Sequence, residues 1–353
     1  MTTIYRDLAV RIRKQEPVAL AVIVETMGSA PQVAGAAAIF SSRRLVAGTI
    51  GGGSLEAHVS RAAAEALRNG EPLIVSYALK GVTIEGPEPI CGGEVRVLVD
   101  PRPQRDDGVF SRLAGSLARG GRGVLATSIV EKWRGKIVVT RDWIPAESRS
   151  SLDREIVSAL ADGRPRLAKV RPTGTPNERA EEEVFLEPVF PPARLVIAGA
   201  GHIGRAVAHL GRLLDFEVMV VDDRREFANK KNLPDADRIV CREIGPALRE
   251  TPLDGNTYIV IVTRGHQKDA EALRACVNSR AGYIGMIGSR SKIAVQRREF
   301  IARKWATAGA FDRVHAPIGL PIRSETVQEI AVSIAAELVL ARRLNAERER
   351  PAG

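Results

Sequence analysis

The sequence is poor in aromatic residues, which make up 4% of its 353 residues. Proteins that bind single-stranded nucleic acid stack the bases on exposed aromatic rings, so such a platform is not expected here. Hydrophobic residues account for 44% and charged residues for 27%, the proportions of a globular protein with a mainly aliphatic core. The length exceeds that of one ordinary domain and is comfortable for two.

Cysteine is also scarce, with only Cys91, Cys241 and Cys276 in the whole chain. This small odd number argues against a disulfide framework and favours a reducing compartment. Residues 1–7 do not form a signal-peptide pattern, and no apolar run is long enough to cross a bilayer. We therefore expect a cytoplasmic protein without membrane attachment.

The formal net charge is +10, but the basic residues alternate with acidic ones. A solvated basic surface is the simplest interpretation, and a phosphate-bearing ligand or an acidic protein partner is the alternative. Neither zinc-finger spacing nor a helix-turn-helix signature is present, so no nucleic-acid partner is expected.

The pattern of apolar runs predicts two domains of an α/β protein, with a boundary at the consecutive prolines of residues 189–192. Residues 1–190 are expected to form an α+β domain with a core module of about residues 1–102. Its expected strands are 18–26, 36–40, 45–50, 73–78, 94–99, 124–130 and 136–140, with helices at 3–15, about 51–68 and 152–161. Residues 194–346 alternate strands (195–198, 217–221, 238–241, 258–263, 283–287) with helices (202–214, 269–278, 326–344). This alternation predicts a Rossmann-type parallel sheet covered on both faces.

The strongest motif is Gly199-Ala200-Gly201-His202-Ile203-Gly204, between an expected strand and helix. In such a fingerprint Gly199 permits the tight turn, Gly201 lets a pyrophosphate approach and Gly204 lets helix and strand pack closely. The helix N-terminus attracts the phosphate, and Asp222 at the end of the next strand is expected to bind a ribose diol. The alternatives are a Rossmann domain that has lost its nucleotide and, for His202, a solvent-facing residue at a helix start.

A second glycine-rich segment is Gly48-Thr49-Ile50-Gly51-Gly52-Gly53-Ser54-Leu55-Glu56. Three glycines between a strand and a helix form a nest of N–H groups of phosphate size. The alternative is a plain turn, with Ser54 as the N-cap and Glu56 favoured by the helix dipole.

A third loop, Pro89-Ile90-Cys91-Gly92-Gly93-Glu94, offers a thiol between small residues. Cys91 is interpreted either as a soft thiolate ligand or reactive thiol, or as a small apolar residue filling a turn. Cys241 and Cys276 are expected to be buried and inert.

Basic residues follow two further strands, in Thr263-Arg264-Gly265-His266 and in Gly288-Ser289-Arg290-Ser291-Lys292. Ligands of such sheets bind outside the carboxyl ends of the strands, where Arg264, Arg290 and Lys292 would contact phosphate. Ordinary surface arginines are the alternative. The Walker A loop, the short-chain dehydrogenase Tyr–Lys pair, the Gly-x-Ser-x-Gly elbow and the His-Glu-x-x-His motif are all absent from the sequence. We therefore expect a binding protein rather than an enzyme.

Taken together, these motifs resemble the XdhC/CoxI family of accessory proteins, which mature xanthine dehydrogenase and related molybdenum hydroxylases. The resemblance covers nearly the whole chain. It is carried by Gly28-Ser29-Ala30-Pro31, Gly52-Gly53-Ser54-Leu55-Glu56, Cys91-Gly92-Gly93, the Gly199–Gly204 fingerprint, Arg264-Gly265-His266, Gly285-Met286-Ile287-Gly288-Ser289, Pro317-Ile318-Gly319-Leu320 and Ser324-Glu325-Thr326.

The resemblance implies a homodimeric chaperone. It would bind the molybdenum cofactor (molybdopterin, alone or as a dinucleotide), shield it while a cysteine desulfurase supplies sulfur to it, and deliver it to the hydroxylase. Many relatives have a cysteine where this chain has Ser54, which leaves Cys91 as the candidate molybdenum contact. The residues assigned to cofactor binding are Gly51, Gly52, Gly53, Ser54, Glu56, Cys91, Gly92, Gly199, Gly201, His202, Ile203, Gly204, Asp222, Arg264, His266 and Arg290. The alternatives are an NAD(P)-dependent oxidoreductase and a nucleotide-sensing regulatory module, either of which would hold a nucleotide at the Rossmann site.

Overall fold

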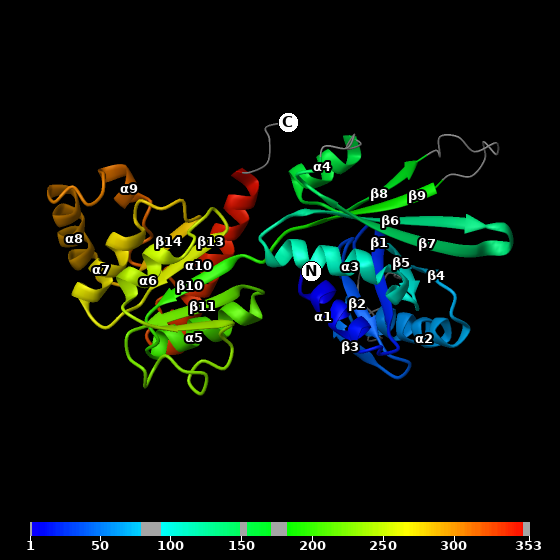
Figure 1. Ribbon diagram of the computed structural model, residues 1–353, viewed down its shortest axis with the longest axis horizontal. Helices are drawn as coiled ribbons and strands as arrows, with labels where there is room; N and C mark the ends of the chain where they lie inside the picture. The colour runs from blue at the N-terminus through cyan, green and yellow to red at the C-terminus, as the bar shows by residue number, and fades with distance from the viewer. Residues whose placement is uncertain (1, 79–92, 149–153, 171–181, 349–353) are drawn as a thin grey trace. The chain divides into compact units, whose positions relative to one another are not determined.

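The computed structural model describes residues 2–78, 93–148, 154–170 and 182–348. Contacts within the chain divide it into two compact units, Met1–Pro191 and Pro192–Gly353 (Figure 1). None of the helices in these described ranges combines the length and the apolar character needed to cross a bilayer. Each unit is built around its own core and is considered by itself.

The first sheet of unit Met1–Pro191 has five antiparallel strands in the order β3-β2-β1-β5-β4. The strands are β1 (Ala19–Met27), β2 (Ala37–Phe40), β3 (Leu45–Gly48), β4 (Leu73–Ala78) and β5 (Glu94–Asp100). Helix α2 (Gly53–Asn69) covers one face, with Leu55, Val59 and Ala63 fully buried against the sheet. Helices α1 (Thr2–Arg13) and α3 (Asp107–Ala118) contribute to the core on the other face.

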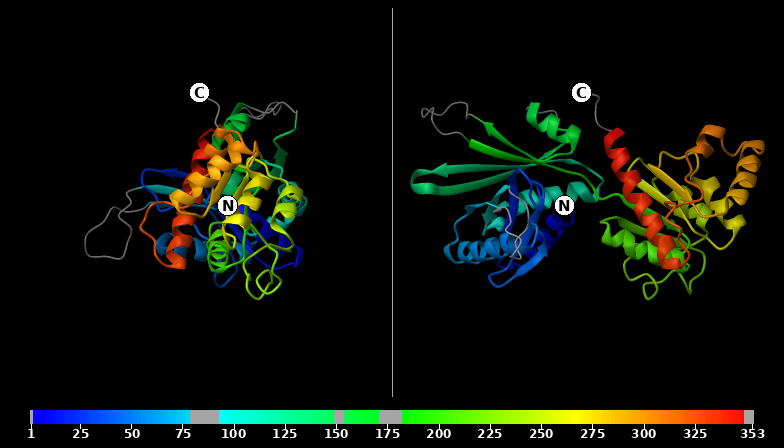
Figure 2. Two further views of the ribbon diagram at one scale, coloured as in Figure 1. Left: turned by 90° about the vertical axis from the view of Figure 1, so that its left-hand side faces the viewer. Right: turned by 180° about the vertical axis from the view of Figure 1, so that it is seen from behind.

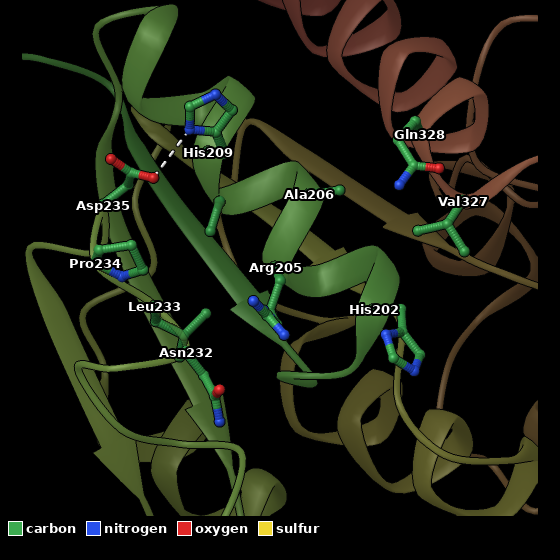
Figure 3. Close-up of a pocket in the computed structure, with 11 residues that line it drawn as sticks. His202, Arg205, Ala206, His209, Asn232, Leu233, Pro234, Asp235, Val327 and Gln328 are labelled. Atoms are coloured by element: carbon green, nitrogen blue, oxygen red, sulfur yellow. Dashed lines mark hydrogen bonds and ion pairs between the residues drawn. The ribbon is translucent and has the colours of Figure 1, made fainter.

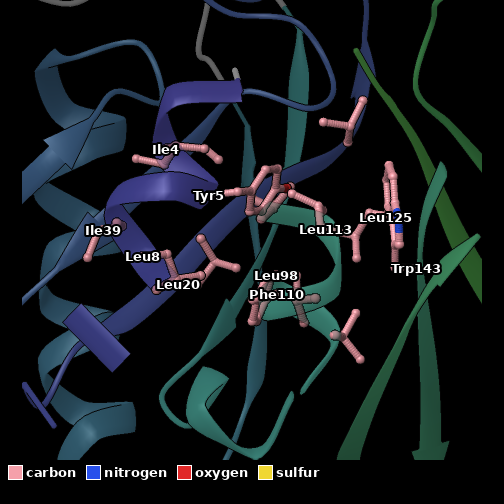
Figure 4. Packing of buried hydrophobic residues seen from close by; sticks show 14 of the residues in the cluster. Ile4, Tyr5, Leu8, Leu20, Ile39, Leu98, Phe110, Leu113, Leu125 and Trp143 are labelled. Carbon is pink, nitrogen blue, oxygen red and sulfur yellow. The ribbon is translucent and has the colours of Figure 1, made fainter. Parts of the chain in front are cut away.

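The second sheet of this unit is antiparallel, in the order β7-β6-β9-β8. Its strands are β6 (Gly123–Lys132), β7 (Lys136–Pro145), β8 (Arg166–Val170) and β9 (Glu182–Val189), and α4 (Arg154–Asp162) packs on it. Short 3-10 helices occupy Pro103–Asp106 and Trp133–Gly135. Figure 4 shows how Tyr5 and Leu8 of α1, Phe110 and Leu113 of α3, and Leu125 and Trp143 of this sheet share one apolar core.

Unit Pro192–Gly353 contains a sheet of five parallel strands in the order β12-β11-β10-β13-β14. Its strands are β10 (Arg194–Ala198), β11 (Glu217–Asp222), β12 (Arg238–Cys241), β13 (Thr257–Ile261) and β14 (Tyr283–Met286). Helices α5 (His202–Leu213) and α10 (Val327–Arg348) cover one face. The opposite face is covered by α6 (Ile244–Glu250), α7 (His266–Cys276), α8 (Arg290–Ala302) and α9 (Ala308–Asp312) (Figure 2). This three-layer arrangement confirms the predicted α/β fold class with a Rossmann-type sheet.

Two expectations from the sequence are wrong and one set of elements was missed. Cys241 is exposed, because it ends the edge strand β12, whereas Cys276 in α7 is buried as expected. Arg290 begins a helix instead of lying in a loop. The sequence patterns also gave no sign of β8, β9, α6, α8 or α9, which contain prolines, many charged residues or too few buried residues to show a period.

Candidate functional site

The loops that follow β10 and β13 meet at the carboxyl edge of the parallel sheet. The Gly199 N–H donates to the Val221 carbonyl (2.8 Å), and the Val262 N–H donates to the Ala198 carbonyl (2.9 Å). A Cβ atom on Gly199 would overlap the Val262 carbonyl oxygen, and the residue has a φ of 115°. Only glycine satisfies both conditions, so the tight turn assigned to Gly199 is present.

The other two fingerprint glycines have contrasting surroundings. A Cβ atom on Gly204 would overlap the Gly199 carbonyl oxygen, so this glycine allows α5 to pack directly on the loop. A Cβ atom on Gly201 would have no neighbour within 4 Å. Open space beside Gly201 is what the approach of a phosphate to the backbone requires.

Helix α5 begins at His202 with Gly201 as its N-cap residue, and no side chain caps it. The N–H groups of its first turn are therefore left for another acceptor, with the positive end of the helix dipole behind them. His202 is exposed and Ile203 is half-buried. The geometry at this helix start is that of an anion site.

The Asp222 carboxylate is buried and points back into the protein. It accepts hydrogen bonds from the Ala200 N–H (2.7 Å), from the Arg224 N–H (3.0 Å) and from both ends of the Arg224 guanidinium (2.9 Å each). Burial alone would raise the pKa of Asp222, but these hydrogen bonds hold it below its ordinary value. Asp222 thus braces the fingerprint loop, and its role in ribose binding remains a prediction.

The next residue, Asp223, is a second acid at this strand end, and the sequence motif did not single it out. Its side chain is 23% exposed and forms ion pairs with Arg264 (3.4 Å) and Lys268 (3.7 Å). Asp223 thereby connects the end of β11 to the loop after β13. A pair of adjacent acids at this strand end was the available signal, and strand pleating decides which of the two is exposed.

The loop after β13 is held by a buried acid at the start of α7. Asp269 accepts hydrogen bonds from the Thr263 hydroxyl (2.7 Å) and the Thr263 N–H (3.1 Å). Burial raises the pKa of Asp269, although these hydrogen bonds oppose the shift. Gly265 has a φ of 92°, and His266 after it is exposed at the first position of α7.

The remaining basic residues of the sheet edge lie in the first turn of α8. Ser289 caps this helix by accepting from the Lys292 N–H. The Arg290 and Lys292 side chains are both exposed. Neither side chain has an ion pair within the part of the chain that the structure describes. Both cations are consequently available to an anionic ligand.

In unit Met1–Pro191, the loop between β3 and α2 is a run of three left-handed glycines. Gly51, Gly52 and Gly53 have φ values of 117°, 70° and 60°, and a Cβ atom on either of the last two would meet nothing within 4 Å. Gly52 is the cap residue of α2 and no side chain caps the helix, so the alternative in which Ser54 is the N-cap is wrong. Glu56 accepts a hydrogen bond from the Thr49 hydroxyl (3.2 Å), which connects α2 to the start of the loop.

The motifs of this unit that are distant in sequence come together at the glycine loop. A Cβ atom on Gly51 would touch the Pro31 ring, and one on Gly93 would overlap the carbonyl oxygens of Met27 and Ser29. The Gly28–Pro31 turn therefore lies between the glycine loop and Gly93. Cys91 and Gly92, two of the predicted site residues, lie outside the described residues.

These features define a two-domain α/β protein whose C-terminal domain presents a dinucleotide-type phosphate loop and whose N-terminal domain carries a second glycine nest. Family models identify both halves: the model of the XdhC and CoxI family matches residues 11–78, and that of the XdhC Rossmann domain matches residues 195–338. The two matches together span more than half of the chain. The chain belongs to the XdhC and CoxI family, as the sequence motifs predicted.

The chain is also similar to individual proteins. The chain is 22% identical over 334 residues to a protein of Bacillus subtilis described as a probable xanthine dehydrogenase subunit, a match covering 94% of this chain and 95% of that protein. It is 33% identical over 147 residues to the uncharacterized protein YqeB of Escherichia coli, covering 41% of this chain but only 27% of YqeB. The crystal structure of a xanthine dehydrogenase from Bacillus halodurans shares the fold, with a TM-score of 0.74, 23% identity and 96% coverage of each chain.

Proposed function

We propose that this protein is an accessory chaperone that binds the molybdenum cofactor, protects it during sulfuration and delivers it to a xanthine dehydrogenase-type hydroxylase. Membership of the XdhC and CoxI family is the observation that carries the proposal. The molybdenum cofactor is the cargo in this scheme, and a cysteine desulfurase and the apo-hydroxylase are the partners. A homodimer is the proposed assembly.

The described residues fit the phosphate end of such a cargo. Open space beside Gly201, the uncapped start of α5 and the unpaired cations Arg290 and Lys292 suit a phosphate or pyrophosphate. The glycine nest at Gly52 and Gly53 offers a second set of backbone donors. A carrier must bind its cargo without altering it and then release it. An exposed, preformed binding site is suited to both steps.

The contribution of the protein is binding rather than chemistry. The buried acids of the Rossmann edge, Asp222 and Asp269, are engaged in bracing loops. We propose Cys91 as the contact for molybdenum, with Ser54 replacing the cysteine that many relatives carry. The soft thiolate of cysteine is the side chain suited to that metal.

Anaerobic gel filtration with freshly released molybdenum cofactor tests the proposal. Pterin fluorescence and molybdenum should elute with the wild-type protein near one equivalent per chain. Cys91→Ser should reduce retention, whereas Cys241→Ser, which alters an exposed cysteine of β12, should not. Retention by no form of the protein would refute the chaperone function, and equal retention by both variants would refute the role of Cys91.

Nucleotide sensing is the second candidate function, and the partly exposed Asp223 favours it. A partly exposed acid one residue beyond β11 is placed to accept hydrogen bonds from a ribose diol in exchange for its long ion pairs with Arg264 and Lys268. Binding of NAD or NADP without turnover, together with no retention of the molybdenum cofactor, would favour this function over the chaperone.

A further inference from the structure

A pocket of about 490 Å³ lies beside the fingerprint helix, on the outer side of α5. Its lining comes from α5, from the connection between β11 and β12, and from the first turn of α10 (Figure 3). This volume is within the range of small-ligand pockets. Of its lining residues, only His202 belongs to the set assigned to cofactor binding.

The basic side chains of α5 differ in whether they form an ion pair with an acid. His209 pairs with Asp235 (2.9 Å) and Arg212 pairs with Asp237 (3.3 Å), both acids belonging to the connection between β11 and β12. Arg205 and His202, nearer the helix start, have no ion pair among the residues that the structure describes. In Figure 3 His202, Arg205 and His209 follow one another along α5, and only His209 is joined to an acid.

The pocket therefore combines positive charge at one end with neutral and apolar walls. The single acid among its described lining residues, Asp235, is already paired with His209. The side-chain amides of Asn232 and Gln328 add hydrogen-bond donors. Pro234 is exposed on the β11–β12 connection and Val327 is half-buried on α10, so apolar contacts are available on both sides of the pocket, whereas Leu233 is buried beneath it (Figure 3).

We propose that this pocket binds a phosphomonoester that carries a planar ring system. The phosphate is held by Arg205 and His202, and the ring packs between Pro234 and Val327. The arginine side chain matches the geometry of phosphate oxygens and remains charged at every working pH. This site is separate from the backbone donors at Gly201, and the proposal does not depend on the identity of the cargo.

Titration calorimetry on the full-length chain tests the site with two probes, adenosine monophosphate and inorganic phosphate. Adenosine monophosphate should bind saturably, and more tightly than phosphate because its ring adds contacts with Pro234 and Val327. Arg205→Gln should weaken its binding on the order of tenfold or more, the effect of losing one charge-assisted contact. Arg212→Gln, on the same helix but outside the pocket, should change the affinity less than about twofold.

A second variant adds a charge without disturbing the fold. Gln328 is exposed at the start of α10, so Gln328→Glu should leave stability unchanged and weaken the binding of adenosine monophosphate by repulsion. An absence of saturable binding to the wild type, equal affinities for the two probes, or equal effects of Arg205→Gln and Arg212→Gln would each overturn the proposal.

The variant Gly201→Val distinguishes binding in this pocket from binding at the fingerprint loop. It should abolish NAD binding, because its side chain would fill the open space beside the helix start, and should leave the binding of adenosine monophosphate intact. If Gly201→Val abolishes adenosine monophosphate binding while Arg205→Gln preserves it, the phosphate lies on the glycine loop and the pocket proposal is wrong. Failure to retain the molybdenum cofactor alongside normal adenosine monophosphate binding would count against the chaperone function alone.

Discussion

The two units of the chain bury charged groups in different places. In Met1–Pro191 the buried Asp100, Arg141 and Glu187 form part of the interior near α1 and the second sheet. In Pro192–Gly353 the buried acids Asp222 and Asp269 stand at the carboxyl edge of the parallel sheet and brace its loops. Buried charge therefore links structural elements in the first unit and shapes a ligand-binding edge in the second.

The largest expected effect is on the tight packing of the Rossmann loop. Gly204→Val would force a side chain into the Gly199 carbonyl, which neither the loop nor α5 can avoid. We expect a loss of unfolding free energy of about 4 kcal/mol or more in this unit. Hydrogen exchange measured by mass spectrometry should show faster exchange in peptides of Pro192–Gly353 and unchanged exchange in those of Met1–Pro191.

Gly201→Ala is the matched control, because the added methyl group meets open space and the φ of Gly201 is −69°. It should change the unfolding free energy by less than about 1 kcal/mol. Similar exchange profiles for Gly204→Val and Gly201→Ala would show that the close approach of α5 to the loop is not required for stability.

The next largest effect concerns the buried arginine of the first unit. Arg141 donates to Asp100 (2.5 Å) and Asp106 (2.8 Å), and its side chain is 1% exposed. Arg141→Met would leave two carboxylates without their cation, at a cost of about 3 to 5 kcal/mol. Urea denaturation should show this loss, whereas Arg112→Met, which removes the exposed pair with Asp142, should cost less than about 1 kcal/mol.

These contrasts also separate what could be predicted from the sequence from what could not. The strands of the Rossmann sheet are short apolar runs, and Gly199 directly follows β10, so the strand positions and the roles of Gly199 and Gly204 follow from the residues. Strand β9 (Glu182–Val189) escaped prediction because it begins with acids and contains Pro188, which opposes strand assignment. Helix α8 buries only Gln296 and Phe300, too few to reveal a helical period.

The site was harder to predict than the fold, because the directions of its side chains cannot be read from the sequence. The motif places an acid at the end of β11, but the choice between Asp222 and Asp223 depends on the pleat of the final residues and on Arg224, which turns back to bind Asp222. The sequence also did not predict that His209 and Arg212 pair with acids of the connection between β11 and β12.

The pH dependence of stability should come largely from the first unit. Burial raises the pKa of Glu187 to about 7 from its ordinary value of 4.5. Between these values the folded protein holds a proton that the unfolded chain has lost, so the unfolding free energy falls as the pH rises through this window. The stabilisation is complete below pH 4.5, is lost above about pH 7, and amounts to about 3 kcal/mol.

Glu187→Gln should remove this dependence while keeping an acceptor for the Tyr5 hydroxyl. Urea denaturation at pH 5 and pH 8 measures the change. Glu183→Gln, in the same strand but paired with Arg96 near the surface, is the control and should retain the wild-type slope. A slope in Glu187→Gln equal to that of the wild type would assign the pH dependence to other groups.

The smallest effect distinguishes the two adjacent acids of the second unit. Asp223→Asn should weaken NAD binding about tenfold if this partly exposed carboxylate accepts from a ribose diol, and should leave stability within about 0.5 kcal/mol of the wild type. Asp222→Asn should lower the unfolding free energy by about 1 to 3 kcal/mol, because the Arg224 guanidinium and the Ala200 N–H lose their charged acceptor. Calorimetry with NAD and urea denaturation together separate the two roles. If Asp222→Asn weakens NAD binding without loss of stability, the buried acid contacts the ligand. Asp222 would then bind the ribose diol, as the sequence motif predicted.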